Sequence, residues 1–246
     1  MKLFFEHLGR LTIMLKIGLS KPENIKEYWK EFMVQCNDIG IRSLPIVIII
    51  SLFLGMVVTL QTAYQFINPI IPRTVVAGIV RDSTIMELSP TVICIVLSGV
   101  VGSKIASELG NMRVSEQIDA LEIMGINSHS FLIMPKIFAA MITIPCLIIL
   151  SIAISIWGGY AACMLSHILT KQQFFMGLHK DFVPFIVTFA IIKAFFFSLI
   201  ISIIPSYYGY YVKGGALEIG RASTTSVIIS CILILFADYG LSLILL

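Results

Sequence analysis

Charged side chains are scarce in this chain of 246 residues, since Asp, Glu, Lys and Arg make up only 13% of it. In soluble globular domains about a quarter of the residues are charged. Hydrophobic residues reach 58%, and the mean hydropathy is +0.97. A water-soluble fold of this size cannot bury so much apolar surface, so the composition excludes an ordinary soluble domain.

Motifs of common catalytic and metal-binding sites are also missing. There is no GxxxxGK sequence followed by Ser or Thr, and the nearest string, Gly99–Lys104, has the wrong spacing to hold a phosphate. The four His are far apart, and neither HExxH nor GxSxG occurs. We therefore expect no ATP hydrolysis by this chain, no metal and no other cofactor.

Two further shortages concern cysteine and basic residues. The five Cys form no CxxC pair, and four of them lie in apolar runs, where we expect small buried hydrophobes. The net charge is only +3, and no basic run alternates with aromatic residues. Nucleic acid is therefore not expected as a partner.

Long apolar runs take the place of these features. About twenty helical residues span the roughly 30 Å hydrocarbon core of a bilayer, and helices satisfy their own backbone groups there. The sequence therefore predicts an all-α integral membrane protein with a membrane domain over residues 44–246. Its five spans are expected at Leu44–Leu60, Ile85–Leu109, Phe131–Leu165, Phe182–Ile204 and Thr224–Leu246. Pro135 and Pro145 predict a tilt, kink or break in the long third span.

Residues 1–43 are expected to form a cytoplasmic and interfacial helical segment. Charges interrupt the first residues, so we expect no cleaved signal peptide. Ser20, Pro22 and Glu23 predict a helix start, and apolar residues then recur at three- and four-residue steps up to Ile39. The pattern favours a helix in the membrane interface, and a soluble helix packed on a partner is the alternative.

The distribution of Lys and Arg predicts the orientation of the chain. One orientation places twelve of them in the cytoplasm, in the amino-terminal segment and in the connections after the second and fourth spans. Four others, Arg73, Arg81, Lys171 and Lys180, then lie outside. Because basic residues are enriched in cytoplasmic loops, the amino terminus is predicted inside and the carboxyl terminus outside.

The stretch from Met86 to Asn127 contains two features of interest. Small residues at steps of four, three and four predict a close helix-packing face, made of Gly99, Ser103, Ala106 and Gly110. Residues 111–125 then predict a short cytoplasmic helix, with Ser115 as its cap and Gly125 at its end. Its apolar side holds Val114, Ile118 and Leu121, and its acidic side holds Glu116, Asp119 and Glu122. Such a helix suits docking into a partner's groove, and an ordinary loop helix is the alternative.

Charged residues also occur within the predicted spans. Glu87, Lys193 and Asp238 are expected to face the bundle interior or water, because an ionised group in the hydrocarbon costs about 2.5–3.5 kcal/mol. They are candidates for contact with a lipid head group, or for a salt-bridged strut. Gln61 and Tyr64, just past the first span, are candidates for the wall of an outer pocket.

One long motif resembles a known family. The string SELGNMRVSEQIDALEIMGIN, preceded by ELSP, is similar to the signature of the MlaE permease family. The similarity extends over Ile192–Ser230 and the string FADYGLS, and covers the chain from about Ser20 onward. Two positions depart from the family: Met86 stands where an Arg commonly precedes ELGP, and Val100 follows Gly99 where the family has a GR pair. Head-group contacts made by those arginines have no counterpart here.

The resemblance implies the permease subunit of an ABC transporter in the bacterial inner membrane. It implies transport of glycerophospholipid to or from a periplasmic MCE-domain carrier, which maintains the lipid asymmetry of the outer membrane. The implied partners are a second copy of the chain and a cytoplasmic ATPase, and a STAS-domain subunit is a further candidate. The implied ATPase-coupling residues are Arg113, Glu116, Gln117, Asp119, Leu121, Glu122 and Met124. The polar residues Glu87, Lys193 and Asp238 match positions near the family's lipid cavity.

Two other classes of protein remain as alternatives. A self-contained secondary transporter would use Glu87, Lys193 and Asp238 as an ion or proton relay, and predicts inverted repeats, which the sequence does not show. An intramembrane enzyme or scaffold predicts paired catalytic residues or a large extramembrane domain, and neither is seen.

Overall fold

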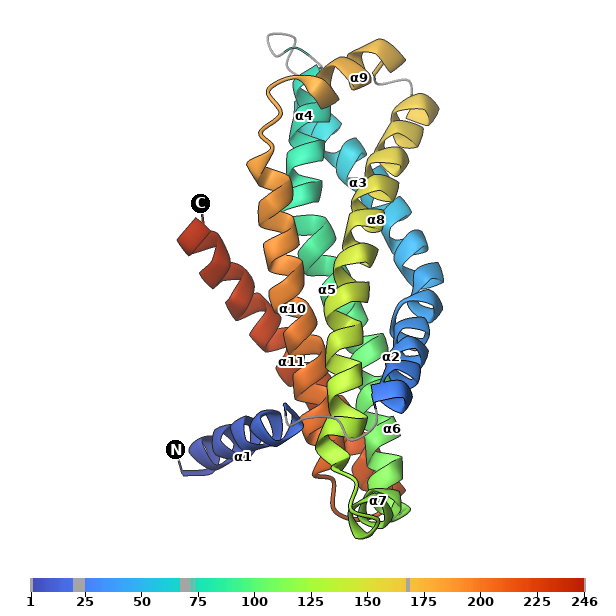
Figure 1. Ribbon diagram of the computed structural model, residues 1–246. Helices are drawn as coiled ribbons and strands as arrows, with labels where there is room; N and C mark the ends of the chain where they lie inside the picture. Colours follow the sequence, from blue (N-terminus) through green and yellow to red (C-terminus); the bar gives the residue numbers. More distant parts are fainter. Residues whose placement is uncertain (1, 20–24, 67–71, 73, 167–168, 246) are drawn as a thin grey trace. The chain divides into compact units, whose positions relative to one another are not determined.

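The computed structural model describes residues 2–19, 25–66, 72, 74–166 and 169–245 (Figure 1). The predicted helix start at Ser20, Pro22 and Glu23 lies outside these residues. Within them the chain forms helices and no strand, which confirms the all-α prediction. The α-helices are α1 (Lys2–Gly18), α2 (Ile25–Ile39), α3 (Leu44–Gln65), α4 (Thr74–Ser83), α5 (Ile93–Leu97), α6 (Ser103–Val114), α7 (Gln117–Ile123), α8 (Met134–Ser166), α9 (Lys171–His179), α10 (Phe185–Tyr210) and α11 (Ala216–Leu245).

Five helical stretches in the described residues are long and apolar enough to cross a membrane, which confirms the number of predicted spans. They are Ile25–Gln65, Thr74–Val114, His129–Ser166, Phe185–Tyr210 and Ala216–Leu245. The second begins well before the predicted Ile85, because α4 continues directly into the following turns. The first joins the amphipathic α2 to α3 through the short 3₁₀ turn η1 (Ile41–Ser43).

The chain divides into two compact units. Unit 1 comprises Met1–Ser43, Ile95–Ile144 and Phe197–Ala237, and unit 2 comprises Leu44–Cys94, Pro145–Phe196 and Asp238–Leu246. Four of the boundaries fall inside α5, α8, α10 and α11. The two units are described separately below.

The second span contains two π-helical segments, η2 (Thr84–Val92) and η3 (Ser98–Gly102), between its α-helical parts. Pro90 lies inside η2. Because proline has no backbone N–H, the regular α-helical ladder cannot continue there, and the wider π turn accommodates it. A third π segment, η4 (His129–Ile133), precedes α8.

The third span is continuous through Pro145, so the break that the two prolines allowed does not occur. Pro135 closely follows the π segment η4, which runs without interruption into α8. Proline has no N–H for the regular α-helical ladder, and the wider π turn before it accommodates the ring. Proline is tolerated inside membrane-spanning helices where neighbouring helices and local adjustments satisfy the freed backbone groups.

In unit 2, small residues let α3 and α8 approach closely. The Ser155 hydroxyl donates a 2.9 Å hydrogen bond to the carbonyl oxygen of Ser51. A Cβ on Gly55 would overlap the Ser155 carbonyl, and one on Gly158 would overlap that of Leu52. These contacts provide the dispersion energy and polar pairing that hold helices together in lipid. Sequence reasoning did not identify this packing face.

Helices α4 and α9, also in unit 2, were not predicted. They lie side by side (Figure 1), and Gly177 of α9 contacts the backbone of Thr74 so closely that a Cβ there would overlap it. Phe174 is fully buried against Val76, Ala77 and Val80. The segment after the first span therefore has its own small apolar core.

In unit 1, α2 has an exposed apolar side. Ile25, Trp29 and Met33 are 75%, 61% and 55% exposed, whereas Gln35 and Ile39 are buried. Asp38 at its end forms ion pairs with Arg42 (3.0 Å) and Lys104 (2.8 Å). The apolar side is thus not covered by the described part of this chain.

The amino-terminal residues of unit 1 form a helix of their own, α1, within the segment 1–43 that was expected to be helical. Met14 is fully buried, and Gly18 contacts the side chain of Met134. The other side of α1 exposes Ile13, Ile17 and Leu19.

Of the cysteines, Cys94 and Cys163 are buried as predicted, and Cys36 and Cys231 are half-buried. Cys146 lies in an apolar run but is exposed, so its predicted burial within the chain is wrong. A residue of a membrane-spanning helix can face lipid without burial in the protein.

Candidate functional site

The structure brings Glu87, Lys193 and Asp238 together in unit 2, from η2, α10 and α11. The ammonium nitrogen of Lys193 lies 2.7 Å from a carboxylate oxygen of Glu87 and 2.6 Å from one of Asp238. It also donates to the Met86 carbonyl at 3.3 Å and lies 4.5 Å from the centre of the Phe189 ring. The side chain of Lys193 is fully buried, so it needs these partners to remain charged.

The charges of this ion cluster do not balance. With all three groups ionised, two carboxylates face one ammonium group, which leaves one negative charge. The Glu87 side chain is 45% exposed and the Asp238 side chain 17%, so the outer face of the cluster is a carboxylate. A negative face repels a phosphate and attracts a cation such as the ammonium group of a zwitterionic head group.

Gln61 and Tyr64 lie on α3 and are exposed, Tyr64 by 71%. Neither contacts the ion cluster in the described structure. The structure thus assembles three of the five candidate lipid-binding residues and leaves these two on the surface.

Helix α7 is the observed form of the predicted cytoplasmic helix, and it is shorter than residues 111–125. Glu116, not Ser115, is its cap residue, with a positive φ of 58° and no side-chain cap hydrogen bond. Ser115 donates instead to the Asn111 carbonyl, one turn back in α6, so the predicted Ser115 cap is wrong. The chain reverses sharply because Glu116 adopts the left-handed conformation.

The end of α7 agrees with the predicted stop at Gly125. Gly125 has a φ of 81°, which a residue with a side chain rarely adopts. Its N–H bonds to the Glu122 carbonyl, and the N–H of Ile126 bonds to the Leu121 carbonyl. This pair of bonds forms a Schellman motif, which satisfies the last carbonyls of the helix.

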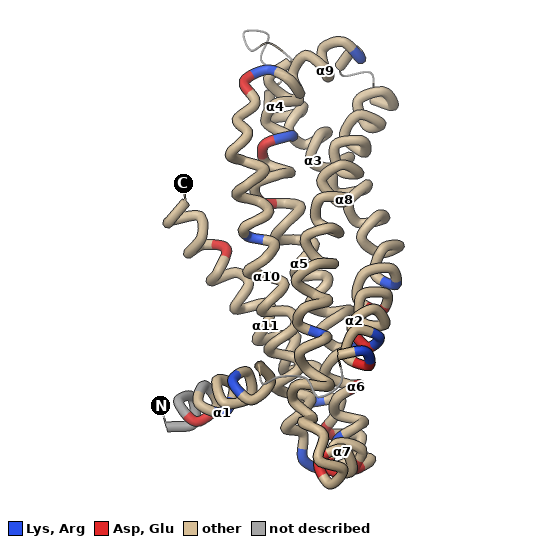
Figure 2. The backbone as a smooth tube through the Cα atoms, viewed as in Figure 1, with Lys and Arg blue, Asp and Glu red and all other residues tan. Residues whose placement is uncertain are grey.

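Both acidic residues of α7, Asp119 and Glu122, are bound to the rest of unit 1. Asp119 forms a 2.6 Å ion pair with Arg113 of α6. Glu122 accepts hydrogen bonds from Ser128 (2.9 Å) and from Tyr210 of α10 (3.0 Å). The bond from Ser128 in particular, and then that from Tyr210, hold the pKa of the Glu122 carboxyl below its ordinary value, although partial burial acts in the opposite direction. Acidic and basic positions gather on α7 and the neighbouring end of α6 (Figure 2).

The acidic residues predicted on this helix stay accessible, since Glu116 and Glu122 are exposed and Asp119 is half-buried. Ile118 is fully buried and Leu121 is half-buried, which anchors the helix. Ile123 and Met124 are 87% and 65% exposed, beside the exposed Glu116 and Gln117. The exposed Ile123 and Met124 form an apolar tip at the end of the helix. The carboxylates of Asp119 and Glu122 fix the helix to its neighbours.

The four small residues of the second span do not behave alike. A Cβ on Gly110 would lie 3.1 Å from Ile219, and the Ala106 backbone lies against Gly209 of α10. The carbonyl of Ser103 accepts a 3.3 Å hydrogen bond from Ser223. Gly99 has nothing within 4 Å of a Cβ position, so the described structure places no second helix there.

Arg81 of α4 is a buried cation of unit 2 that sequence reasoning placed in an outer connection. Its side chain is 4% exposed and pairs with Asp82 at 2.7 Å. The guanidinium donates to the carbonyl oxygens of Leu178 (2.6 Å), in the last turn of α9, and of Lys180 (2.9 Å), just after it. It therefore fixes the end of α9 to α4. In the sequence, the adjacent Asp82 was the feature that could have indicated an ion pair for Arg81.

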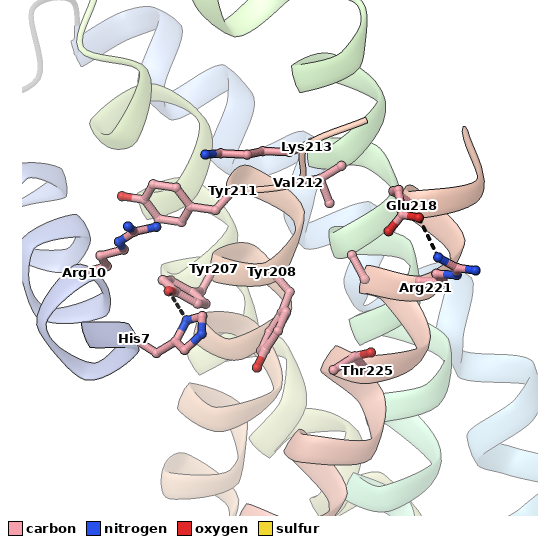
Figure 3. A pocket seen from close by; sticks show the side chains of 11 residues that line it. His7, Arg10, Tyr207, Tyr208, Tyr211, Val212, Lys213, Glu218, Arg221 and Thr225 are labelled. Atoms are coloured by element: carbon pink, nitrogen blue, oxygen red, sulfur yellow. Dashed lines mark hydrogen bonds and ion pairs between the residues drawn. The ribbon is translucent and has the colours of Figure 1, made fainter. Parts of the chain in front are cut away.

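A polar cavity of about 440 Å³ in unit 1 was also missed (Figure 3). It lies between α1, the end of α10 and the start of α11. Its walls carry tyrosine hydroxyls and three cations from segments far apart in the sequence, which explains why no local pattern revealed it.

Comparison with known proteins places the chain in a family context. The family described as Permease MlaE matches residues 32–244. A probable ABC transporter permease protein of Rickettsia bellii is 34% identical over 95% of this chain and 90% of its own length. The intermembrane phospholipid transport system permease protein MlaE of Haemophilus influenzae is 30% identical over 97% of this chain and 92% of its own length. The chloroplastic protein TRIGALACTOSYLDIACYLGLYCEROL 1 of Arabidopsis thaliana is 30% identical over 88% of this chain and 62% of its own length.

Proposed function

Because this chain belongs to the MlaE permease family, we propose that it is the permease of an ABC transporter that moves glycerophospholipid. Its lipid would pass between the inner membrane and a periplasmic MCE-domain carrier, and the outer membrane would thereby keep its lipid asymmetry. The name of the Haemophilus relative, a phospholipid transport permease, supports this substrate. The motor would be a separate ATPase, since the sequence contains no phosphate-binding loop.

The observation that carries the proposal is the construction of α7. A seven-residue helix with an exposed apolar tip is held at both ends, by Arg113 at one side and by Tyr210 at the other. A tip that docks a partner must be both exposed and rigid, so that motion of the partner reaches the membrane helices. Tyr210 is the last residue of α10 and provides that connection.

The distribution of Lys and Arg supports an orientation with α7 in the cytoplasm. The three ranges of unit 1 contain all twelve Lys and Arg residues that the positive-inside rule assigns to the cytoplasm. The exposed apolar side of α2 also suits a helix in the membrane interface, with Trp29 at head-group level.

For lipid handling we propose the exposed face of the ion cluster together with Gln61 and Tyr64. Glu87 offers a carboxylate to a head-group ammonium, and the two exposed polar side chains on α3 offer further polar contacts. Lys193 then keeps the cluster together and need not contact lipid itself.

A homodimer is the proposed assembly. Helix α11 leaves large apolar side chains uncovered along its length, among them Phe236 (71%) and Leu243 (72%). A second copy or the surrounding lipid would cover them. A STAS-domain subunit remains a candidate partner of the ATPase.

The test is co-purification of the tagged chain from its native membrane, with identification of associated proteins and of bound phospholipid. A variant with Ile123→Ser and Met124→Ser removes the apolar tip of α7. Its control, Leu165→Ser with Met176→Ser, changes two side chains of unit 2 that are 78% and 67% exposed. We expect the native chain and the control to retain an ATPase and an MCE-domain protein, and the α7 variant to lose the ATPase alone.

Two results would count against the proposal. One is a native chain that purifies without any ATPase, and the other is an α7 variant that retains as much ATPase as the control. A secondary transporter is then favoured, since the buried charges of the ion cluster could serve as a relay. Lipid transport in proteoliposomes that lack the ATPase distinguishes an ABC permease from a secondary transporter. Only the secondary transporter would move lipid under a proton gradient.

A further inference from the structure

The cavity in unit 1 is built from three elements that meet at the ends of membrane spans. His7 and Arg10 of α1 form one side, tyrosines from the end of α10 lie between, and residues of α11 form the other side (Figure 3). His7 and the hydroxyl of Tyr207 lie 2.6 Å apart, which joins α1 to α10. The cavity is therefore held open by direct contacts between its walls.

Positive charge predominates in this cavity. Arg10, Lys213 and Arg221 line it, with Glu218 as the one lining carboxylate. Arg221 pairs with Glu218 at 2.7 Å, and Arg10 pairs with Glu6 at 2.6 Å. Lys213 has no ion pair within the described residues. One positive charge thus stays uncompensated, so the cavity attracts an anion.

Hydrogen-bond donors surround the same space. Tyr207, Tyr208 and Tyr211 bring three phenol groups, and Thr225 adds a hydroxyl from α11. The Tyr211 phenol carries its proton at neutral pH in any case, and burial raises its pKa further. Arginine forks and hydroxyls together match the oxygens of a phosphate, which accept hydrogen bonds only.

The position of the cavity along the spans fits a lipid head group. Tyr207 and Tyr208 lie in the last turn of the span Phe185–Tyr210, and Glu218 and Arg221 lie in the first turns of Ala216–Leu245. Span ends lie at the level of lipid head groups, where tyrosine and basic residues are enriched. Ile13 and Ile17 of α1 are also exposed and offer an apolar surface suited to acyl chains.

From this geometry we propose that the cavity binds the phosphate of a net-anionic phospholipid, such as phosphatidylglycerol, taken from the leaflet that surrounds α1. The site belongs to unit 1 and shares no residue with the ion cluster. A lipid bound there would hold α1 against α10 whether or not the chain transports lipid. The proposed site is therefore independent of the proposed transport function.

The test measures lipid binding by native mass spectrometry on the full chain in detergent, with equal amounts of phosphatidylglycerol and phosphatidylcholine. We expect the native chain to retain phosphatidylglycerol in preference. Arg10→Gln with Lys213→Gln removes one cation of α1 and one of the connection between α10 and α11, and should weaken this binding at least about tenfold. Lys30→Gln with Lys171→Gln removes two exposed cations elsewhere and should leave the preference intact.

A charge-preserving double variant tests whether the loss of binding comes from the loss of charge or from a change in the fold. Arg10→Lys with Lys213→Arg keeps both charges and should preserve the preference. The proposal fails if the native chain shows no preference, or if the Gln pair behaves like its control. Displacement of the lipid by excess inorganic phosphate would overturn the lipid assignment in favour of a free anion.

A second measurement does not depend on any variant. A phosphatidylglycerol analogue with a photoreactive head group should label peptides that contain Tyr207–Tyr211 or α1. Labelling confined to other peptides would contradict the proposed site. Both experiments use the permease without ATP or ATPase, so a failure of the transport proposal would leave their results unchanged.

Discussion

The hydroxyl of Tyr210 donates a 3.0 Å hydrogen bond to Glu122 and so joins the end of α10 to α7, across 88 positions of the sequence. The same oxygen lies 2.7 Å from the Ser128 hydroxyl and 3.4 Å from the His129 ring. A displacement of α7 therefore acts on α10 and on the start of η4 through one phenol group.

Removal of that hydroxyl should loosen α7 without changing the exposed tip. Tyr210→Phe leaves Glu122 with fewer donors and should lower the free energy of unfolding by about 1 kcal/mol. Amide hydrogen exchange in residues 117–123 should become faster. Tyr239→Phe, at a tyrosine that is 71% exposed, is the control and should change neither measurement. Equal exchange in both variants would show that Tyr210 does not anchor α7.

Stability should depend on the Glu122 carboxylate in a defined pH range. Its folded pKa lies below the ordinary value, first because Ser128 donates to it, so its contribution is complete above the unfolded pKa of about 4.3. The contribution is lost as the pH falls through the folded pKa. Because the side chain is exposed, we expect less than about 1 kcal/mol.

The measurement compares thermal unfolding of the native chain and Glu122→Gln at pH 7 and at pH 3.5 or below. The native chain should be more stable at pH 7, and the difference should shrink in acid. A difference that grows in acid would contradict the assigned sign.

The ion cluster should tolerate complete neutralisation better than loss of its cation. Lys193→Met leaves two carboxylates without a cation and should destabilise the chain by about 3 kcal/mol. Adding Glu87→Gln and Asp238→Asn should restore much of that stability, as measured by thermal unfolding in detergent. If the single and triple variants are equally unstable, charge balance is not what Lys193 provides.

The triple variant also separates the two roles considered for the cluster. A strut predicts that lipid transfer by the reconstituted transporter recovers together with stability. Head-group binding at Glu87 predicts that transfer stays low although the fold recovers.

Two glycines of unit 1 should respond in opposite ways to alanine. A Cβ on Gly209 would lie 2.6 Å from the Ala106 carbonyl oxygen, so Gly209→Ala should cost about 1–3 kcal/mol. Gly99 has nothing within 4 Å, and Gly99→Ala should be neutral or raise stability by up to about 1 kcal/mol. Thermal unfolding of the two variants provides the comparison. A marked loss with Gly99→Ala would indicate that another subunit covers this position.

Periodic and compositional features were predictable from the sequence. The five spans and the helix stop at Gly125 follow from local signals, namely apolar runs and the conformational freedom of glycine. The Ser115 cap was wrong because the same hydroxyl can bond backward to Asn111, and only the reversal at Glu116 decides between the two. The partners of the α7 carboxylates, Arg113, Ser128 and Tyr210, could not be predicted because they come from other elements.

By itself the sequence determined that this protein crosses the membrane, since apolar runs of sufficient length have no other stable environment, and its motif indicated the family. The tertiary structure alone decided which charges meet. It paired Lys193 with two carboxylates, joined Asp119 to Arg113 and Glu122 to Tyr210, and assembled the cavity around Tyr207. The reason is that these contacts join residues far apart in the chain, and the energy of a charge depends on its neighbours in space.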